Sequence, residues 1–296
     1  ESTMNSTSSP TIAVTAATGK LGQLVVSSLL ERGVPADHIV AIVRNPAKAQ
    51  GLFAPGVQIR QADYNSPEGW DRALAGVQRL LLISSSDLND RADQHRTVIE
   101  AASAAGVELL AYTSLLKADT ARMSLAADHQ ATEKLLTESG VPFVLLRNGW
   151  YLENYDLAQA LQTGSVLGAA GTGRISAASR KDLAEAAAAA LTRDGQAGKV
   201  YELAGDEAFS LSELAAELSK QSGKDVQYRN FAPEDYQRTL EGFGLPAPVA
   251  QMLVSSDEGV ARGELELPNS DLRELIGRPS TSLKEAVASQ LAGQQA

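Results

Sequence analysis

Near its N-terminus the chain reads Thr11-Ile-Ala-Val-Thr15, followed at once by Ala16-Ala-Thr-Gly19-Lys-Leu-Gly22. The first five residues are apolar or β-branched and predict a strand. The next seven have the spacing G-x-x-G-x-x-G with alanine at the first glycine, and apolar residues then recur at helical spacing as far as Arg32. A strand that turns tightly into a helix is typical of dinucleotide binding, because backbone N–H groups and the helix N-terminus then face a pyrophosphate.

Short apolar runs and helical patterns continue to alternate outward from this stretch. Further strands are expected at residues 38–43, 57–61, 79–83, 107–113 and 142–147. Helices are expected from Ser66-Pro67-Glu68 onward, near 90–105 and near 126–139. Strands that alternate with helices form parallel sheets with right-handed crossovers. The pattern therefore predicts an α/β fold with a Rossmann-type doubly wound parallel sheet.

The regular alternation ends at about residue 150. We expect a helix near 150–163, a flexible glycine-rich loop at 168–173 with no buried strand leading into it, a helix at 181–192 and a strand at 199–203. Capping boxes at Ser210/Glu213 and Ser282/Glu285 mark two more helix starts.

These patterns predict three parts of the chain. The first is a disordered N-terminus or tag remnant at residues 1–10. The second is a dinucleotide-binding Rossmann domain at 11–157, to which 174–205 returns. The third is a smaller, mostly helical lobe on the substrate side, formed by 158–173 and 206–296.

Composition excludes several classes of function. A net charge of −10 argues against a nucleic-acid surface, and the absence of cysteine removes thiol chemistry and disulfides. The three histidines (His38, His95 and His129) lack a metal-ligand spacing, so no metal is expected. Neither a signal peptide nor an apolar run of about 18 residues is visible, so we expect a cytoplasmic chain without membrane insertion.

The glycine-rich turn is the first candidate cofactor site. Gly19 would let phosphates approach the backbone, and Gly22 would let helix and strand pack closely. Alanine tolerates a positive φ poorly, so Ala16 is expected to weaken binding if the turn needs that conformation. The residues assigned to the cofactor here are Ala16, Ala17, Thr18, Gly19, Lys20 and Leu21.

Arg44 follows the second strand, where an NAD-specific site usually has an acidic residue. A guanidinium there can bind a 2′-phosphate through two hydrogen bonds, so NADP is predicted over NAD, with Lys48 nearby. The alternative is a solvated arginine at a strand end.

Polar residues also follow the third and fourth strands. Asp63 is a candidate for the adenine edge, and Ser84, Ser85 and Ser86 are candidates for the pyrophosphate or nicotinamide ribose, because ligands bind at the carboxyl ends of parallel strands. The alternative for each is a strand-end side chain that faces water.

The usual acid–base pair of short-chain dehydrogenases is missing. Tyr112-Thr113-Ser114 ends the fifth strand, but the following helix reads His129-Gln-Ala-Thr-Glu133-Lys134 and has no Tyr-x-x-x-Lys. Alcohol oxidation is therefore disfavoured, because a proton must be removed from a hydroxyl group in that reaction.

Several blocks in combination resemble the NmrA-like atypical short-chain dehydrogenases, and within them the bacterial type 2 NADPH:quinone oxidoreductases. The blocks are Ala16–Gly22, Val43–Ala49, Leu80–Ser86, Tyr112–Leu116, Leu146–Tyr151 and Lys199–Asp206. The resemblance implies NADPH bound by residues 16–21, Arg44, Ser84–Ser86 and a further segment, Asn148, Gly149, Trp150 and Tyr151. It also implies two-electron reduction of a quinone without flavin.

Roles at the reaction centre follow from this resemblance. Asn148 is expected to hold the nicotinamide amide or a quinone oxygen, and Ser114 and His129 are candidate polar groups or proton sources. His129 is nevertheless interpreted rather as a partly exposed helix residue, and His95 as a helix-surface residue without a role. Trp150 and Tyr151 form an aromatic wall or, alternatively, anchor the second lobe.

Two other functions stay open at this point. One is a non-catalytic NADP(H)-binding redox sensor that regulates a partner protein, since a missing Tyr-x-x-x-Lys suits that class too. The other is a reductase of other extended aromatic acceptors. The expected partner is thus a small quinone or aromatic molecule, and the choice between monomer and dimer is open.

Overall fold

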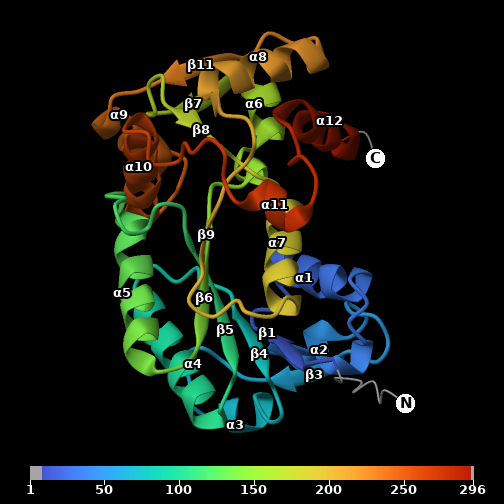
Figure 1. Ribbon diagram of the computed structural model, residues 1–296. Coiled ribbons are helices and arrows are strands. Elements are labelled where there is room, and N and C mark those ends of the chain that lie inside the picture. The colour runs from blue at the N-terminus through green and yellow to red at the C-terminus, as the bar shows by residue number, and fades with distance from the viewer. Residues whose placement is uncertain (1–8, 295–296) are drawn as a thin grey trace.

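The computed structural model describes residues 9–294 and is built on one seven-stranded sheet (Figure 1). The strand order is β3-β2-β1-β4-β5-β6-β9, and every neighbouring pair is parallel. The strands are β1 Ile12–Val14, β2 Ile39–Val43, β3 Gln58–Gln61, β4 Arg79–Leu82, β5 Leu109–Leu115, β6 Phe143–Asn148 and β9 Val200–Leu203. The predicted fold class is confirmed. The expected disorder at residues 1–10 falls mainly on residues 1–8, which lie outside the described residues.

Helices cover both faces of the sheet, which explains why its central strands are nearly continuous apolar runs. The helices α1 (Lys20–Glu31), α7 (Arg180–Thr192) and α11 (Leu272–Ile276) pack on one face. The helices α3 (Trp70–Ala73), α4 (Arg91–Ala105) and α5 (Ser124–Ser139) lie on the other (Figure 1). A short helix, α2 (Pro46–Ala49), follows β2.

A second lobe lies beyond the carboxyl ends of β5 and β6 (Figure 1). Its helices are α6 Leu157–Thr163, α8 Leu211–Ser222, α9 Pro233–Gly242, α10 Ala247–Ala261 and α12 Leu283–Gln294. Its hydrophobic residues form two clusters, the larger of which also includes Leu115 of β5 and Ala126 of α5. The lobe is joined to the loop after β5 by hydrogen bonds from Lys117 Nζ to the Gly263 carbonyl and from the Arg122 N–H to Glu264.

The glycine-rich segment 168–173 differs from the prediction, because a strand does lead into it. This strand, β7 (Ser165–Gly168), pairs in parallel with β11 (Gln227–Asn230), and β8 (Arg174–Ile175) pairs antiparallel with β10 (Phe209–Ser210). These strands have two to four residues each, too few to show an alternation of polar and apolar residues.

Two predicted helix boundaries are also wrong. The helix expected near 150–163 is a 3₁₀ turn at Leu152–Asn154 followed by α6, because the Asp156 side chain accepts from the Gln159 N–H and starts a new helix. The helix expected from Ser66 begins only at Trp70. Ser66 instead accepts from Glu68 in a local turn, and Gly69 follows with a left-handed φ of 86°.

The two capping boxes are confirmed. Ser210 Oγ accepts from the Glu213 N–H at 3.2 Å. Ser282 Oγ accepts from the Glu285 N–H at 3.1 Å, and Glu285 accepts in return from the Ser282 N–H. Among residues 9–294 no helix is long and apolar enough to cross a membrane.

Candidate functional site

The turn between β1 and α1 has the close packing that its glycines predict. A Cβ on Gly22 would lie 2.4 Å from the Ala16 carbonyl oxygen and 2.8 Å from Ala17 Cα, so only glycine fits there. The Gly19 N–H donates to the Ala16 carbonyl at 3.0 Å. No side chain caps the N-terminus of α1, and its first turn holds no acidic residue. The free N–H groups at this helix end therefore fit an anionic pyrophosphate.

Ala16 adopts the conformation that its side chain disfavours. Its φ is 47°, in the left-handed region, and its side chain is exposed. For an L-residue other than glycine this conformation costs roughly 1–2 kcal/mol. The turn thus needs at Ala16 the geometry that glycine adopts without cost.

We expect Ala16→Gly to tighten NADPH binding by about threefold to tenfold, because about 1 kcal/mol of strain is no longer borne by the turn. A fluorescence titration with NADPH measures the change. Ala17→Gly is the matched control, since Ala17 is absent from the residues with a positive φ, and it should bring no gain. Unchanged affinity in Ala16→Gly would mean that the strain does not affect binding.

A hollow of about 490 Å³ opens beside the end of β2. It is lined by Arg44, Arg60, Gln61, Ala62, Asp63, Ser66, Glu68, Gly69, Arg72 and Ala73. The guanidinium of Arg60 is held by the carbonyls of Ala73 and Ala75. Arg44 and Arg72 are both exposed and face the same hollow. Two cations there suit a phosphate monoester.

Arg72 was missed at the sequence level. It belongs to a four-residue helix that no motif marks, and only the packing of this helix on β3 brings it near Arg44. Lys48 lies in α2 and is not among the residues that line the hollow. Asp63 does line it, but its carboxylate accepts from the Asn65 N–H in a local turn. The assignments of Lys48 and Asp63 to the cofactor stay predictions.

The three serines after β4 differ in their surroundings. Ser84 lines a second pocket, and its N–H donates to Thr113 Oγ1 at 2.8 Å. The Ser85 N–H donates to His95 and its hydroxyl to Gln94, so Ser85 is held toward α4. Ser86 is exposed. Ser84 is therefore the member of this segment that faces the pocket.

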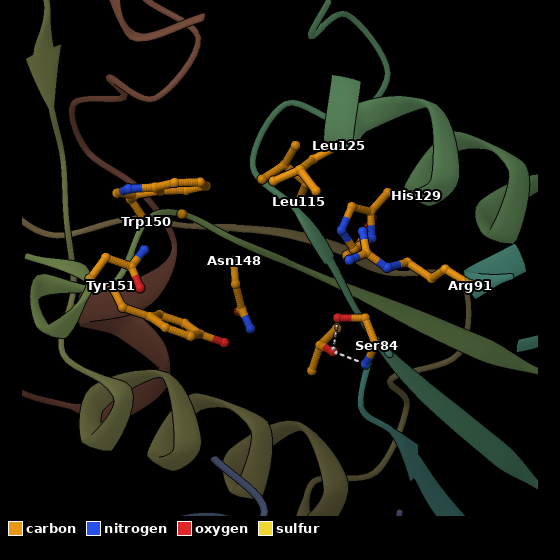
Figure 2. A pocket seen from close by; sticks show the side chains of 12 residues that line it. Ser84, Arg91, Leu115, Leu125, His129, Asn148, Trp150 and Tyr151 are labelled. Atoms are coloured by element: carbon orange, nitrogen blue, oxygen red, sulfur yellow. Dashed lines mark hydrogen bonds between the residues drawn. The ribbon is translucent and has the colours of Figure 1, made fainter. Parts of the chain in front are cut away.

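This second pocket, of about 160 Å³, lies at the carboxyl ends of β4, β5 and β6. It is lined by Ser84, Arg91, Thr113, Ser114, Leu115, Leu125, His129, Asn148, Gly149, Trp150, Tyr151 and Asn154. Figure 2 shows Trp150 and Tyr151 on one side, His129 and Arg91 on the other, and Asn148 between them. Because β4 neighbours β1, the pocket and the glycine-rich turn share one edge of the sheet. The structure thus brings the three candidate catalytic residues into one pocket: Ser114, His129 and Asn148.

The aromatic pair joins the two halves of the molecule. Trp150 packs against the hydrophobic cluster of the second lobe, and Tyr151 against the cluster beneath α1 and α7. The guanidinium of Arg180 lies 5.3 Å from the centre of the Tyr151 ring. The two expectations, a wall and an anchor, are therefore compatible, since both rings line the pocket and pack against a core.

His95 is not on the helix surface, and that prediction is wrong. The ring is fully buried, its Nε2 accepts from the Ser85 N–H at 2.9 Å, and its Nδ1 lies 2.8 Å from Thr132 Oγ1. Burial, and secondarily the charge of Arg91, lowers the pKa of His95 to about 3. The neutral ring ties the loop after β4 to α5.

His129 is also buried rather than partly exposed. Its Nδ1 lies 2.7 Å from the Tyr112 hydroxyl. Burial raises the pKa of Tyr112, so the phenol keeps its proton. Burial, then Arg91 and His95, lowers the pKa of His129 to about 3. His129 is thus a neutral imidazole, with Nδ1 hydrogen-bonded to the Tyr112 hydroxyl.

We expect kcat to lack an inflection near the ordinary histidine pKa of about 6.5, because His129 stays neutral above its lowered pKa. The pH profile of kcat between about pH 5 and about pH 8 measures this. An inflection in that range that His129→Gln removes would contradict a neutral His129.

Ser114 is engaged in an ion-pair network. Its hydroxyl donates to Glu133 Oε2 at 2.5 Å, and Glu133 is held by Arg147 at 2.7 and 3.1 Å. Glu202 and Asp119 also lie within 3.5 Å of the Arg147 guanidinium. Ser114 lines the pocket, but its proton points to a carboxylate. Its catalytic role stays a prediction.

Asn148 is buried, and its Oδ1 has no hydrogen-bond partner among the described residues. A buried polar atom without a partner costs roughly 1–3 kcal/mol of stability. Such an atom in a residue that lines a pocket indicates that a ligand group supplies the missing hydrogen bond. The uncapped helix N-terminus, the arginine-lined hollow and this amide fit the pyrophosphate, the 2′-phosphate and the carboxamide of NADPH, respectively.

A family model described as NAD(P)H-binding matches residues 16–194. Quinone oxidoreductase 2 of Escherichia coli (strain K12) is 53% identical over 279 residues, which cover 94% of this chain and 97% of that protein. The NmrA-like family domain-containing oxidoreductase flvB of Aspergillus flavus is 31% identical over 93% of this chain and 92% of its own.

Two solved structures are similar to this chain over most of its length. The NADPH-dependent quinone oxidoreductase of E. coli complexed with NADPH has a TM-score of 0.92 and 53% identity, with 95% of this chain and 99% of that chain covered. Triphenylmethane reductase of Citrobacter sp. complexed with NADP(H) has a TM-score of 0.86 and 38% identity, with 94% and 99% covered.

Proposed function

The chain belongs to the NAD(P)H-binding family of NmrA-like atypical short-chain dehydrogenases, and on that basis we propose that it is an NADPH:quinone oxidoreductase. The reaction is the two-electron reduction of a quinone without flavin. The observation that carries the proposal is the pocket beyond β4–β6, which combines aromatic walls with polar groups and lies on the edge of the sheet that bears the glycine-rich turn.

NADPH supplies a hydride when bound, and quinone, hydride and one proton together give the hydroquinone. The residues of the pocket orient the acceptor. Trp150 and Tyr151 offer flat apolar faces to a quinone ring. The Asn148 amide and the His129 imidazole hold its oxygen or the nicotinamide carboxamide. Because no proton is removed from a hydroxyl, the reaction does not need Tyr-x-x-x-Lys, and orientation together with electrostatic stabilisation lowers the barrier.

Reduction of larger aromatic cations or dyes is a second candidate, favoured by the 38% identity to triphenylmethane reductase. The same pocket would serve both reactions. The cytoplasmic location and the domain boundaries stay predictions from the sequence, and the choice between monomer and dimer stays open.

The test compares NADPH oxidation with a small benzoquinone, a triphenylmethane dye and no acceptor, using purified protein. We expect the highest kcat/KM with the benzoquinone. A higher value with the dye would favour the second candidate. Tight NADPH binding without turnover of either acceptor would indicate a redox sensor instead.

A further inference from the structure

Arg91 is the first residue of α4, and its side chain is only 8% exposed. Among the described residues, two buried side-chain polar atoms lack a hydrogen-bond partner: Arg91 Nε and Asn148 Oδ1. Both residues line the pocket beyond β4–β6. The unsatisfied donor and the unsatisfied acceptor therefore belong to two side chains that line the same cavity.

The charge of Arg91 is poorly compensated. Its ion-pair partner is Asp128, with Nη1 and Oδ2 3.8 Å apart, beyond hydrogen-bond distance, and Asp128 is 35% exposed. Arg147 offers a contrast: it is similarly buried, but Glu133 binds it at 2.7 Å and two further carboxylates lie within 3.5 Å. A buried cation without such partners destabilises the folded state, because the lost hydration of its charge is not replaced.

Of the other groups near Arg91, Asp87 carries a negative charge, but its carboxylate already accepts from the Asn89 and Asp90 N–H groups and makes no ion pair with Arg91 among the described residues. His95 and His129 are both neutral, and the charge of Arg91 contributes to lowering the pKa of each. Its position at the N-terminus of α4 is also unfavourable, because the helix dipole there repels a cation. Burial, weak pairing and helix position all cost stability, and costs of this kind are typical of functional sites.

We propose that Arg91 is a catalytic residue that binds the quinone oxygen on which negative charge develops. This inference rests on the proposed function and names a residue for it. Hydride transfer breaks a C–H bond of the dihydronicotinamide and forms an O–H bond at one quinone oxygen. An electron pair moves through the ring onto the other quinone oxygen, and NADPH is oxidised to NADP⁺. The resulting hydroquinone monoanion then takes a proton from water. Figure 2 shows Arg91 beside His129 on one side of the pocket.

The kinetic test compares Arg91→Met with Arg91→Lys and with Arg96→Met. Arg96 lies in the same helix, is 52% exposed and pairs with Asp93, so it is the matched control. We expect Arg91→Met to lower kcat about 10²-fold, as the loss of one oxyanion donor does, with KM for the quinone changed less than about threefold. Arg91→Lys should retain about a tenth of the parent kcat, and Arg96→Met should have the kcat of the parent.

Thermal stability separates this role from a structural one. Because Arg91→Met removes a weakly paired buried charge and leaves an apolar side chain of similar length, we expect Tm to stay the same or rise. A fall in Tm that accompanies the loss of activity would overturn the proposal, since Arg91 would then support the fold.

A binding probe tests the same contact without turnover. 4-Nitrophenol is an aromatic phenol whose anion absorbs visible light, so its ionisation in the pocket can be followed directly. With NADP⁺ present, we expect bound 4-nitrophenol to have a pKa at least about one unit below its value in water, because Arg91 stabilises the phenolate. In Arg91→Met the lowering should disappear, whereas in Arg96→Met it should persist.

Other outcomes would assign a different role to Arg91. A raised KM with unchanged kcat, or NADPH affinity weakened about tenfold in Arg91→Met, would overturn the proposal in favour of substrate capture or cofactor binding. If the parent reduces no quinone but still ionises 4-nitrophenol through Arg91, the proposed function fails while Arg91 stands as an oxyanion ligand.

Discussion

Arg44→Glu is expected to weaken NADPH binding by about 10²–10³-fold and to change NADH binding by less than about tenfold. The substitution removes a guanidinium from the hollow beside β2 and places a carboxylate against the 2′-phosphate. Loss of charge-assisted hydrogen bonds accounts for about 1.5–3 kcal/mol, and repulsion between the anions adds to it. The preference for NADPH should therefore be abolished or reversed.

Dissociation constants for both cofactors, from fluorescence titration, measure this change. Arg44→Gln removes the cation without adding a negative charge. Its dissociation constant for NADPH should therefore lie between those of the parent and of Arg44→Glu. Arg72→Gln should weaken NADPH binding without affecting NADH, because Arg72 lines the same hollow. A parent protein that binds NADH and NADPH equally would refute the role of Arg44.

Gly22→Ala is expected to lower the free energy of unfolding by about 2–3 kcal/mol and to weaken NADPH binding about 100-fold. The added Cβ would lie 2.4 Å from the Ala16 carbonyl oxygen and 2.8 Å from Ala17 Cα. Both atoms belong to the backbone of the cofactor turn, so neither can rotate away. The helix α1 must move off the turn, and its N-terminus then points away from the pyrophosphate.

Chemical denaturation and NADPH titration together measure this effect. Gly242→Ala is the matched control, because a Cβ there meets no atom within 4 Å and the backbone does not have a positive φ. Wild-type affinity and stability in Gly22→Ala would contradict the close packing of α1 on the turn.

The Rossmann half was predictable because its strands are buried on both faces. Such strands are continuous apolar runs, as at Ile39–Val43, and the helix start after Gly19 carries its own signal in the glycine spacing. The small strands of the second lobe carry no such signal, since the partners Ser165–Gly168 and Gln227–Asn230 are short and far apart in the sequence.

The candidate site was predictable where a strand end places a polar side chain. Arg44 and Asn148 follow or end their strands, and each lines a cavity of the structure. The burial of His95 and Arg91 could not be predicted, because the buried face of α4 includes polar residues at its N-terminal end and the His95 ring is bound by Ser85 and Thr132 from outside the helix. Predicting burial from helical periodicity assumes that apolar residues face the core, and a helix whose polar residues face inward does not follow that pattern.

The most direct test of flavin-free hydride transfer is a single-turnover measurement with NADPH deuterated at the transferred position. Purified protein free of flavin is loaded with the labelled or unlabelled cofactor and mixed with a small benzoquinone. Direct transfer predicts stoichiometric hydroquinone, a slower rate with the deuterated cofactor, and no acceleration by added flavin. Hydroquinone formation that requires added flavin, or no formation at all, would contradict the assignment of this chain as a flavin-independent NADPH:quinone oxidoreductase.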